Sequence, residues 1–140
     1  MNKETVLLIH GFGTNNRVWD QYKDFFSKNG FLILAPNLRH HAPGDNLEGF
    51  EKVSLLDYVD DLEILIKELN LQPIIMGYSM GGLLALKLME RGCGRLGICL
   101  TPAAPAGINA ISLSVLRLFL RNLLVWRFWR KVHKPRFSSA

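Results

Sequence analysis

One short segment, Gly77-Tyr78-Ser79-Met80-Gly81, constrains the fold of this chain more than any other. It follows the apolar run 73–76 and precedes the helix-like stretch 82–90. A G-x-S-x-G segment between a strand and a helix is typical of a nucleophile elbow, a tight turn that presents the serine hydroxyl at the carboxyl end of a parallel sheet. We expect Gly77 and Gly81 to support the elbow, because glycine lets two backbones approach where a Cβ would clash. The alternative is an ordinary strand-to-helix turn that contains a serine.

A second glycine-rich loop, His10-Gly11-Phe12-Gly13, follows the apolar run 6–9. Acyl transfer develops negative charge on the former carbonyl oxygen, and each preorganised N–H donor there contributes ~3–4 kcal/mol. Met80, directly after the serine, offers one backbone N–H, and Phe12 is the candidate for the second. His10 closes a strand far upstream of Ser79, so we expect it to tether the loop, with Gly11 as further support, rather than to act as the catalytic base.

The chain resembles the α/β-hydrolase family through four segments in order. These are Leu8-Ile9-His10-Gly11-Phe12-Gly13 with Trp19 after it, Leu34-Ala35-Pro36-Asn37-Leu38-Arg39-His40-His41, Gly77-Tyr78-Ser79-Met80-Gly81-Gly82, and Gly97-Ile98-Cys99-Leu100-Thr101-Pro102. The resemblance covers roughly residues 5–107. It implies a serine hydrolase in which Ser79 attacks a small carboxylic ester, a histidine acts as base and an Asp or Glu orients that histidine. It implies no cofactor.

Apolar runs and helical periodicity alternate along the first hundred residues. We predict strands at 5–9, 31–35, 74–76 and 96–100, and helices at 18–28, 54–69 and from the elbow to about 90. Such alternation predicts an α/β fold with a mostly parallel sheet covered by helices on both faces. We therefore expect residues 1–107 to form the N-terminal part of an α/β-hydrolase core, and residues 108–140 to form a basic, helical, lid-like segment.

Charge divides the chain sharply at residue 91. The first 90 residues hold 8 Lys/Arg and 12 Asp/Glu, whereas the rest holds 9 Lys/Arg and no acidic residue. The family's order of serine, acid, histidine therefore cannot be completed here, since no carboxylate follows Glu90 and only His133 follows Ser79. Three explanations stay open: the front part of a longer hydrolase that stops within its lid, a protein that has lost catalysis, or an oligomer or half-enzyme completed by a second chain.

Residues 111–134 carry basic side chains on one arc of a helical wheel and Phe, Leu and Trp on the other. We interpret this segment as a lid helix, with weak contact to an anionic membrane surface as the alternative. Prolines and arginines interrupt the apolar stretches and argue against a transmembrane span. The tail contains no nucleic-acid-binding motif, so we expect no nucleic acid partner.

Other features predict no further chemistry. The pair His40-His41 lacks suitably spaced companions, so we expect loop packing and no metal site. Cys93 and Cys99 lack zinc-type spacing and are interpreted as reduced thiols. The N-terminal apolar run is too short for a secretory signal, which together with the cysteines predicts a cytoplasmic protein. The acidic cluster 57–63 is interpreted as the solvated face of a helix.

Overall fold

The computed structural model describes residues 3–105, 107–108 and 113. All of the helices and strands below lie in one compact unit that ends at Ala103, and residues 104–140 form a second unit. The predicted lid-like segment 108–140 lies almost wholly outside the described residues, so its helix and the predicted division at 107/108 stay predictions.

The centre of the compact unit is a four-stranded parallel sheet with the order β2-β1-β3-β4. The strands are β1 (Thr5–Ile9), β2 (Leu32–Leu34), β3 (Ile74–Tyr78) and β4 (Leu96–Leu100). In the pairing of β1 with its two neighbours, Leu7 lies opposite Leu34 of β2 and Ile75 of β3. The predicted parallel sheet is thereby confirmed, and β1 and β4 have the predicted bounds.

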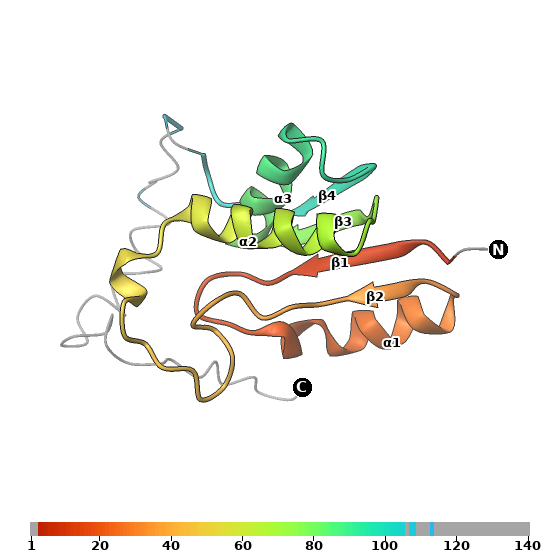
Figure 1. The fold of residues 1–140 in the computed structure, drawn as a ribbon, viewed down its shortest axis with the longest axis horizontal. Coiled ribbons are helices and arrows are strands. Elements are labelled where there is room, and N and C mark those ends of the chain that lie inside the picture. The colour runs from red at the N-terminus through yellow and green to blue at the C-terminus, as the bar shows by residue number, and fades with distance from the viewer. Residues whose placement is uncertain (1–2, 106, 109–112, 114–140) are drawn as a thin grey trace. The chain divides into compact units, whose positions relative to one another are not determined.

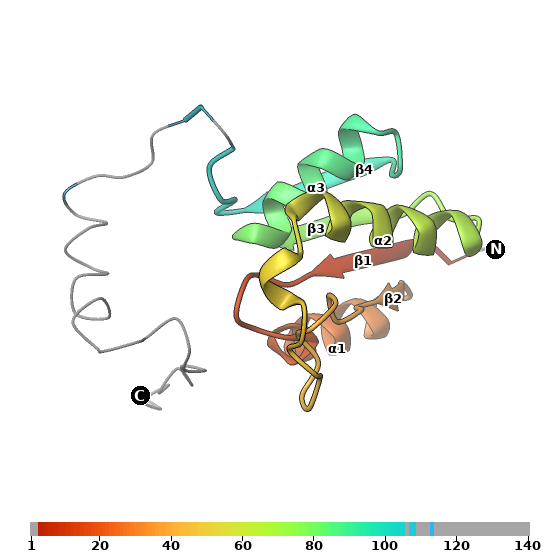
Figure 2. The same cartoon turned by 60° about the vertical axis from the view of Figure 1, so that its left-hand side comes forward.

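Helices cover both faces of this sheet (Figures 1 and 2). Helix α1 (Asp20–Lys28) lies on one face, and α2 (Leu55–Glu68) and α3 (Met80–Glu90) lie on the other. Two short 3-10 helices, η1 (Asn16–Trp19) and η2 (Phe50–Lys52), precede α1 and α2. The helix predicted at 18–28 therefore begins differently, because the Asn15 side chain caps a 3-10 turn before the α-helix starts.

Alternate residues of β1 supply the two halves of the core. Leu7 and Ile9 pack with α2 and α3, whereas Val6 and Leu8 pack with Trp19 and Met76 on the other face. Side chains alternate between the faces of a strand, so an apolar strand buried on both sides contributes to both clusters. Full burial of each such side chain contributes about 1.5–3 kcal/mol.

Two sequence predictions about burial need correction. The strand predicted at 31–35 is shorter, and Leu32 is half exposed because β2 is an outer strand of the described sheet. In α2, helical spacing predicts that Leu55, Val59, Leu62, Ile66 and Leu69 face the sheet. Of these, Val59, Leu62 and Ile66 are buried, but Leu55 and Leu69 are exposed. These two lie at the ends of the helix.

The helix start at Ser54 was predicted correctly. The Ser54 hydroxyl accepts a hydrogen bond from Asp57 N, and the Asp57 carboxylate accepts one from Ser54 N, which is a capping box. The hydrogen bonds that the Ser54 hydroxyl and the Ser54 N–H donate to the Asp57 carboxylate hold the pKa of Asp57 below its usual value. Across the described residues, no helix is long and apolar enough to cross a membrane.

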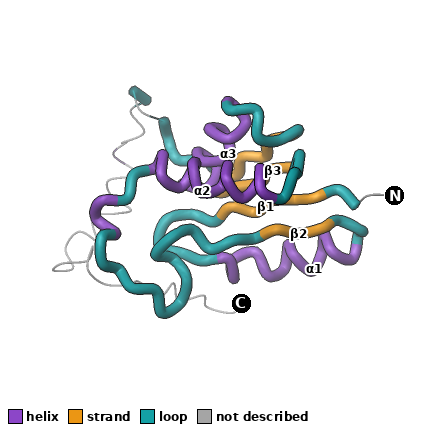
Figure 3. The backbone as a smooth tube through the Cα atoms, in the orientation of Figure 1, coloured by secondary structure: helices purple, strands orange, loops and turns teal. Residues whose placement is uncertain are grey.

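Because all four strands are parallel, their carboxyl ends share one edge of the sheet. The loop after β1 and the long connection from β2 to α2 gather at that edge (Figure 3). The turn from β3 into α3 also lies there, because β3 pairs with β1 in parallel. Ligands of open α/β sheets bind at this edge.

Candidate active site

Ser79 occupies the turn between β3 and α3 in a strained conformation, with φ 53° and ψ −122°. Non-glycine residues rarely adopt positive φ, and such strain persists only where surrounding contacts enforce it. Here Ser79 N donates to Leu100 O at 3.1 Å, and Ser79 O accepts from Gly82 N at 3.1 Å and Ala103 N at 2.9 Å. Hydrogen bonds to β4, α3 and the segment after β4 therefore hold this turn.

The glycines beside the serine are required by close backbone contacts. A Cβ added to Gly77 would lie 2.1 Å from Gly81 O, and one added to Gly81 would lie 2.2 Å from Ile9 O. Real Cβ atoms do not approach backbone oxygens this closely. The start of α3 is consequently packed directly against the backbones of β1 and β3.

The loop after β1 lies against the same turn. A Cβ on Gly11 would be 3.2 Å from Ser79 Cβ and 3.0 Å from a ring carbon of Tyr78. Phe12 follows, with its side chain 64% exposed. Within the described part of the chain, the backbone N–H groups of Phe12 and Met80 have no acceptor.

His10 joins two loops at the carboxyl edge of the sheet. Its Nε2 accepts from Leu38 N at 3.0 Å, so its proton lies on Nδ1, which is 2.9 Å from Gly11 O. The ring is fully buried, and burial lowers its pKa, with the nearby His41 contributing in the same direction. Both nitrogen atoms are engaged, so neither is available to take a proton from Ser79.

Two hydroxyl groups at this site were missed in the sequence. Thr14 Oγ1 donates to Gly11 O at 2.8 Å and lies 2.7 Å from Tyr78 Oη. Tyr78 is the variable residue before the serine in the motif, and its ring packs edge-on against Trp19. No local pattern pairs Thr14 with Tyr78, because 64 residues separate them.

The loop containing Arg39, His40 and His41 packs over this edge, as predicted. The His41 ring contacts the rings of His10, Phe12, Phe50 and Tyr58, with centroids 5.3–6.0 Å apart. Phe12 also stacks on Phe50 at 6.1 Å. His41 Nδ1 is 2.9 Å from Arg39 O, and its buried Nε2 has no partner among the described residues.

In the acidic cluster on α2, which the sequence predicts to be solvated, Asp60 is exposed whereas Asp57, Asp61 and Glu63 are partly buried, and three of the four form ion pairs. Asp61 pairs with Arg39, and Arg91 lies 2.5 Å from Asp60 and 2.6 Å from Glu63. These pairs bind the loop after β2 and the end of α3 to α2. These pairs hold the pKa values of Arg39 and Arg91 above the usual value. The pKa of Glu63 is below its usual value, chiefly because Lys67 donates a hydrogen bond to it and next because Arg91 does.

Neither cysteine forms a disulfide. Cys93 is buried, Cys99 is partly buried, and burial raises the pKa of each thiol. Among the residues that the structure describes, no three His, Cys, Asp or Glu side chains come together in a group that could hold a metal ion.

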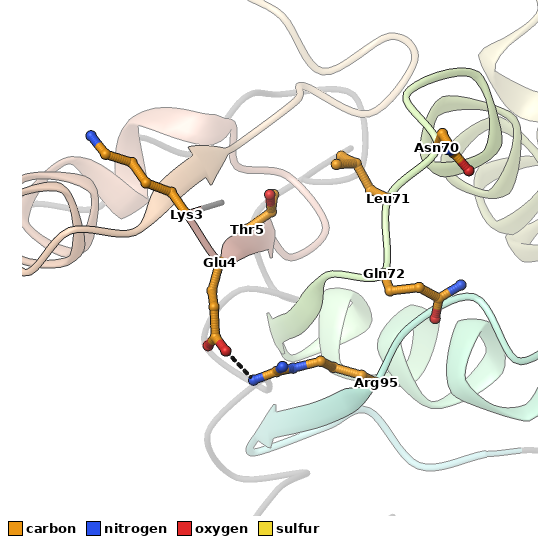
Figure 4. A pocket seen from close by; sticks show the side chains of 7 residues that line it. All are labelled: Lys3, Glu4, Thr5, Asn70, Leu71, Gln72 and Arg95. Atoms are coloured by element: carbon orange, nitrogen blue, oxygen red, sulfur yellow. Dashed lines mark ion pairs between the residues drawn. The ribbon is translucent and has the colours of Figure 1, made fainter. Parts of the chain in front are cut away.

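A shallow hollow of about 340 Å³ lies at the opposite end of the sheet (Figure 4). It is lined by residues that precede or begin β1, β3 and β4: Lys3, Glu4, Thr5, Asn70, Leu71, Gln72 and Arg95. Glu4 and Arg95 form an exposed ion pair across it at 2.7 Å. It contains none of the elbow residues, so we do not assign it to the same site.

Comparison with known proteins places this geometry in a family. A sequence model described as "Alpha/beta hydrolase family" matches residues 6–140. An AB hydrolase superfamily protein of Bacillus subtilis is 31% identical over 107 residues, covering 72% of this chain and 38% of the relative. A thermostable monoacylglycerol lipase of a Bacillus species is 30% identical over 113 residues, covering 74% of this chain and 44% of the lipase.

The fold is also similar to that of a solved hydrolase structure. A solved extracellular alpha/beta-hydrolase from a Paenibacillus species superposes with a TM-score of 0.67 at 21% identity, over 84% of this chain and 50% of that one. The chain thus spans half or less of the length of each of these proteins. With a matching parallel sheet, a strained serine at the strand-to-helix turn and a match over residues 6–140, the chain belongs to the alpha/beta hydrolase family.

Proposed function

We propose that this chain carries the nucleophile and the oxyanion donors of a serine hydrolase that acts on carboxylic esters. The observation that carries the proposal is the backbone of Ser79, held at φ 53° between β3 and α3 with the Gly11 loop against it. A monoacylglycerol lipase among the similar proteins supports ester chemistry, since its name describes the cleavage of a carboxylic ester.

In the proposed reaction, Ser79 Oγ attacks the ester carbonyl carbon and a base takes the hydroxyl proton. The N–H groups of Phe12 and Met80 donate to the negative oxygen of the tetrahedral intermediate. The intermediate collapses, the base returns the proton to the departing alcohol, and water then hydrolyses the acyl-serine. His10, Gly11, Gly77 and Gly81 hold the two loops in place.

The base and its orienting acid are proposed to come from outside these 140 residues. No carboxylate follows Glu90 in the sequence, and both His10 nitrogen atoms are already engaged. The proposed source is either a further part of a longer protein or a second chain. An elbow serine without a base is a weak nucleophile, because its hydroxyl stays protonated at neutral pH.

Labelling with a fluorophosphonate tests the assignment of Ser79. We expect slow labelling of the 140-residue chain, lost in Ser79→Ala and retained in the matched control Ser27→Ala in α1 and in His133→Ala. Hydrolysis of p-nitrophenyl acetate should stay barely above background, because removing triad members lowers turnover by about 10⁴–10⁶. Labelling that persists in Ser79→Ala would refute the nucleophile. Rapid labelling of the parent would refute the missing base.

The outer strands support a second chain as a partner. β2 and β4 are the outer strands of the described sheet, and unpaired strand edges favour association. We expect light scattering at tens of micromolar to detect oligomers, and a monodisperse monomer would refute this. Membrane-surface contact through 111–134 remains a prediction, since only Leu113 of that segment is described.

A further inference from the structure

The carbonyl group of Gly11 accepts two hydrogen bonds from buried or partly buried donors. One comes from His10 Nδ1 at 2.9 Å and the other from Thr14 Oγ1 at 2.8 Å. A carbonyl oxygen has two lone pairs, so this oxygen is fully used. Both donors lie on the same side of the Gly11–Phe12 peptide bond, where the oxygen points.

The same peptide bond carries the Phe12 N–H. The described chain has no cis peptide bond, so the C=O and N–H of this planar unit point in opposite directions. Two donors that fix the direction of the oxygen therefore also fix the direction of the N–H. Hydrogen bonds to the carbonyl further polarise the peptide group, which makes its N–H a stronger donor.

Thr14 is in turn held by Tyr78. The Thr14 hydroxyl has one proton, which it gives to Gly11 O, so its contact with Tyr78 Oη at 2.7 Å requires Tyr78 to donate. Tyr78 is the last residue of β3 and directly precedes Ser79. The two hydroxyl groups thus link β3, the strand that leads to Ser79, to the loop that contains Phe12.

We propose that Thr14 and Tyr78 are positioning residues for the Phe12 N–H: the Thr14 hydroxyl, itself held by Tyr78, clamps the Gly11 carbonyl together with His10 and so aims the opposite N–H at the oxyanion formed on Ser79 attack. This inference rests on the proposed function, because it assigns the relay to that same site. It adds Thr14, which lies outside the two glycine-rich motifs, and Tyr78, the variable residue before the serine.

The test measures fluorophosphonate labelling of Ser79 in the full chain, separated into reagent affinity and maximal rate. Thr14→Val keeps the shape of the side chain and removes the donor. We expect its maximal rate to fall about tenfold with affinity unchanged, a smaller loss than the roughly 10²–10³ for deleting a whole oxyanion donor. Thr14→Ser restores the hydroxyl and should return the rate to within about twofold of the parent.

A double-mutant cycle tests the relay itself. Tyr78→Phe alone should slow labelling about threefold, and adding it to Thr14→Val should cost nothing more, because the chain of donors is already broken. Thr5→Val in β1 and Tyr22→Phe in α1 make the same chemical changes away from the loop and should label at the parent rate. Thermal unfolding of each variant establishes that it is folded.

Other outcomes would overturn the positioning role or the proposed function. A parent rate in Thr14→Val, equal losses in Thr14→Val and Thr14→Ser, or a loss of affinity alone would overturn the positioning role while leaving Ser79 as the nucleophile. If Thr14→Val does not fold, Tyr78→Phe decides, and a parent rate there overturns the relay. A parent chain that never labels at Ser79 would refute the proposed function, and the relay with it.

Discussion

At the carboxyl ends of β1 and β3, polar groups are buried and joined by specific hydrogen bonds, whereas the residues just before β1 and β4 at the amino end are exposed and paired by charge. His10 and the Gly11 carbonyl represent the first kind of contact, and the Glu4–Arg95 ion pair represents the second. The amino end has the hollow, but the carboxyl end has the strained serine.

We therefore place the proposed active site at the carboxyl end, although the hollow lies at the amino end. Catalysis by backbone donors needs N–H groups fixed in direction before the substrate arrives. Buried hydrogen bonds and close backbone contacts provide that rigidity, since an unmade hydrogen bond is costly where water cannot replace it. Exposed ion pairs provide little, because water and salt compete with them.

The largest expected effect comes from a methyl group at the carboxyl edge. In Gly81→Ala the new Cβ would lie 2.2 Å from Ile9 O, so β1 and α3 must separate. We expect a loss of about 3 kcal/mol or more in the free energy of unfolding, measured by urea denaturation. The control Gly92→Ala, at the other end of α3, meets no atom within 4 Å and should cost only the roughly 1–2 kcal/mol of its positive φ. Equal costs would remove the contrast between the two ends.

The next effect concerns the buried imidazole. His10→Ala would leave Leu38 N–H without its acceptor and remove one donor from Gly11 O. We expect a loss of about 2–3 kcal/mol in the free energy of unfolding, because a buried group without a partner costs about 1–3 kcal/mol. A loss below 0.5 kcal/mol, on the order of a surface substitution, would contradict the described contacts.

His10 also predicts how stability depends on pH. Burial lowers its pKa in the folded chain, so below the ordinary value of about 6.5 the unfolded chain binds more protons than the folded one. The contribution of His10 is therefore complete above that value and is lost as pH falls towards the folded pKa. Urea denaturation between pH 7.5 and 5 should show this decline in the parent and a flatter curve in His10→Gln. Superimposable curves would contradict the prediction.

An exposed hydrogen bond at the carboxyl side should matter less than a buried one. Ser54→Ala removes the side-chain half of the α2 capping box. We expect a loss of about 1 kcal/mol in the free energy of unfolding. Ser27→Ala, near the end of α1, changes the same atom without a cap and should stay within about 0.5 kcal/mol of the parent. A loss at Ser54 that equals the loss at His10 would show that burial is not the deciding factor.

The smallest effect is expected at the amino edge. Arg95→Ala removes the ion pair with Glu4 and opens the hollow. We expect a change below about 1 kcal/mol in the free energy of unfolding, reduced further by salt, and fluorophosphonate labelling at the parent rate. Slower labelling in this variant would link the hollow to Ser79 and break the distinction between the two ends.

Local sequence was sufficient for much of the fold. Largely apolar runs predicted β1 and β4 with their observed bounds, and the helix predicted from residue 54 begins there with Ser54 as its N-cap. The bounds of β2 and the first turn of the helix before Lys28 differ, since the outer position of β2 and the cap at Asn15 decide them. The strand predicted at 74–76 also differs, because β3 extends to Tyr78 through its pairing with β4. None of these features is encoded in hydrophobic periodicity.

The sequence also predicted which candidate site residues lie near one another. Their catalytic roles remain predictions. Ser79, Met80 and the glycines lie within one turn, so their spacing alone requires them to be neighbours. Phe12 was placed near them through its loop after a neighbouring strand. These inferences rely on short-range geometry, which a sequence specifies directly.

Only the tertiary structure decided which distant groups meet. It joined Thr14 to Tyr78, His10 to Leu38, and His41 to the rings of Phe50 and Tyr58. It also pairs three carboxylates of α2 with Arg39 and Arg91. These contacts span long stretches of chain. Those at the carboxyl edge form because parallel strands bring their following loops to one edge of the sheet, and the Arg91 pairs form because α2 and α3 pack side by side on one face.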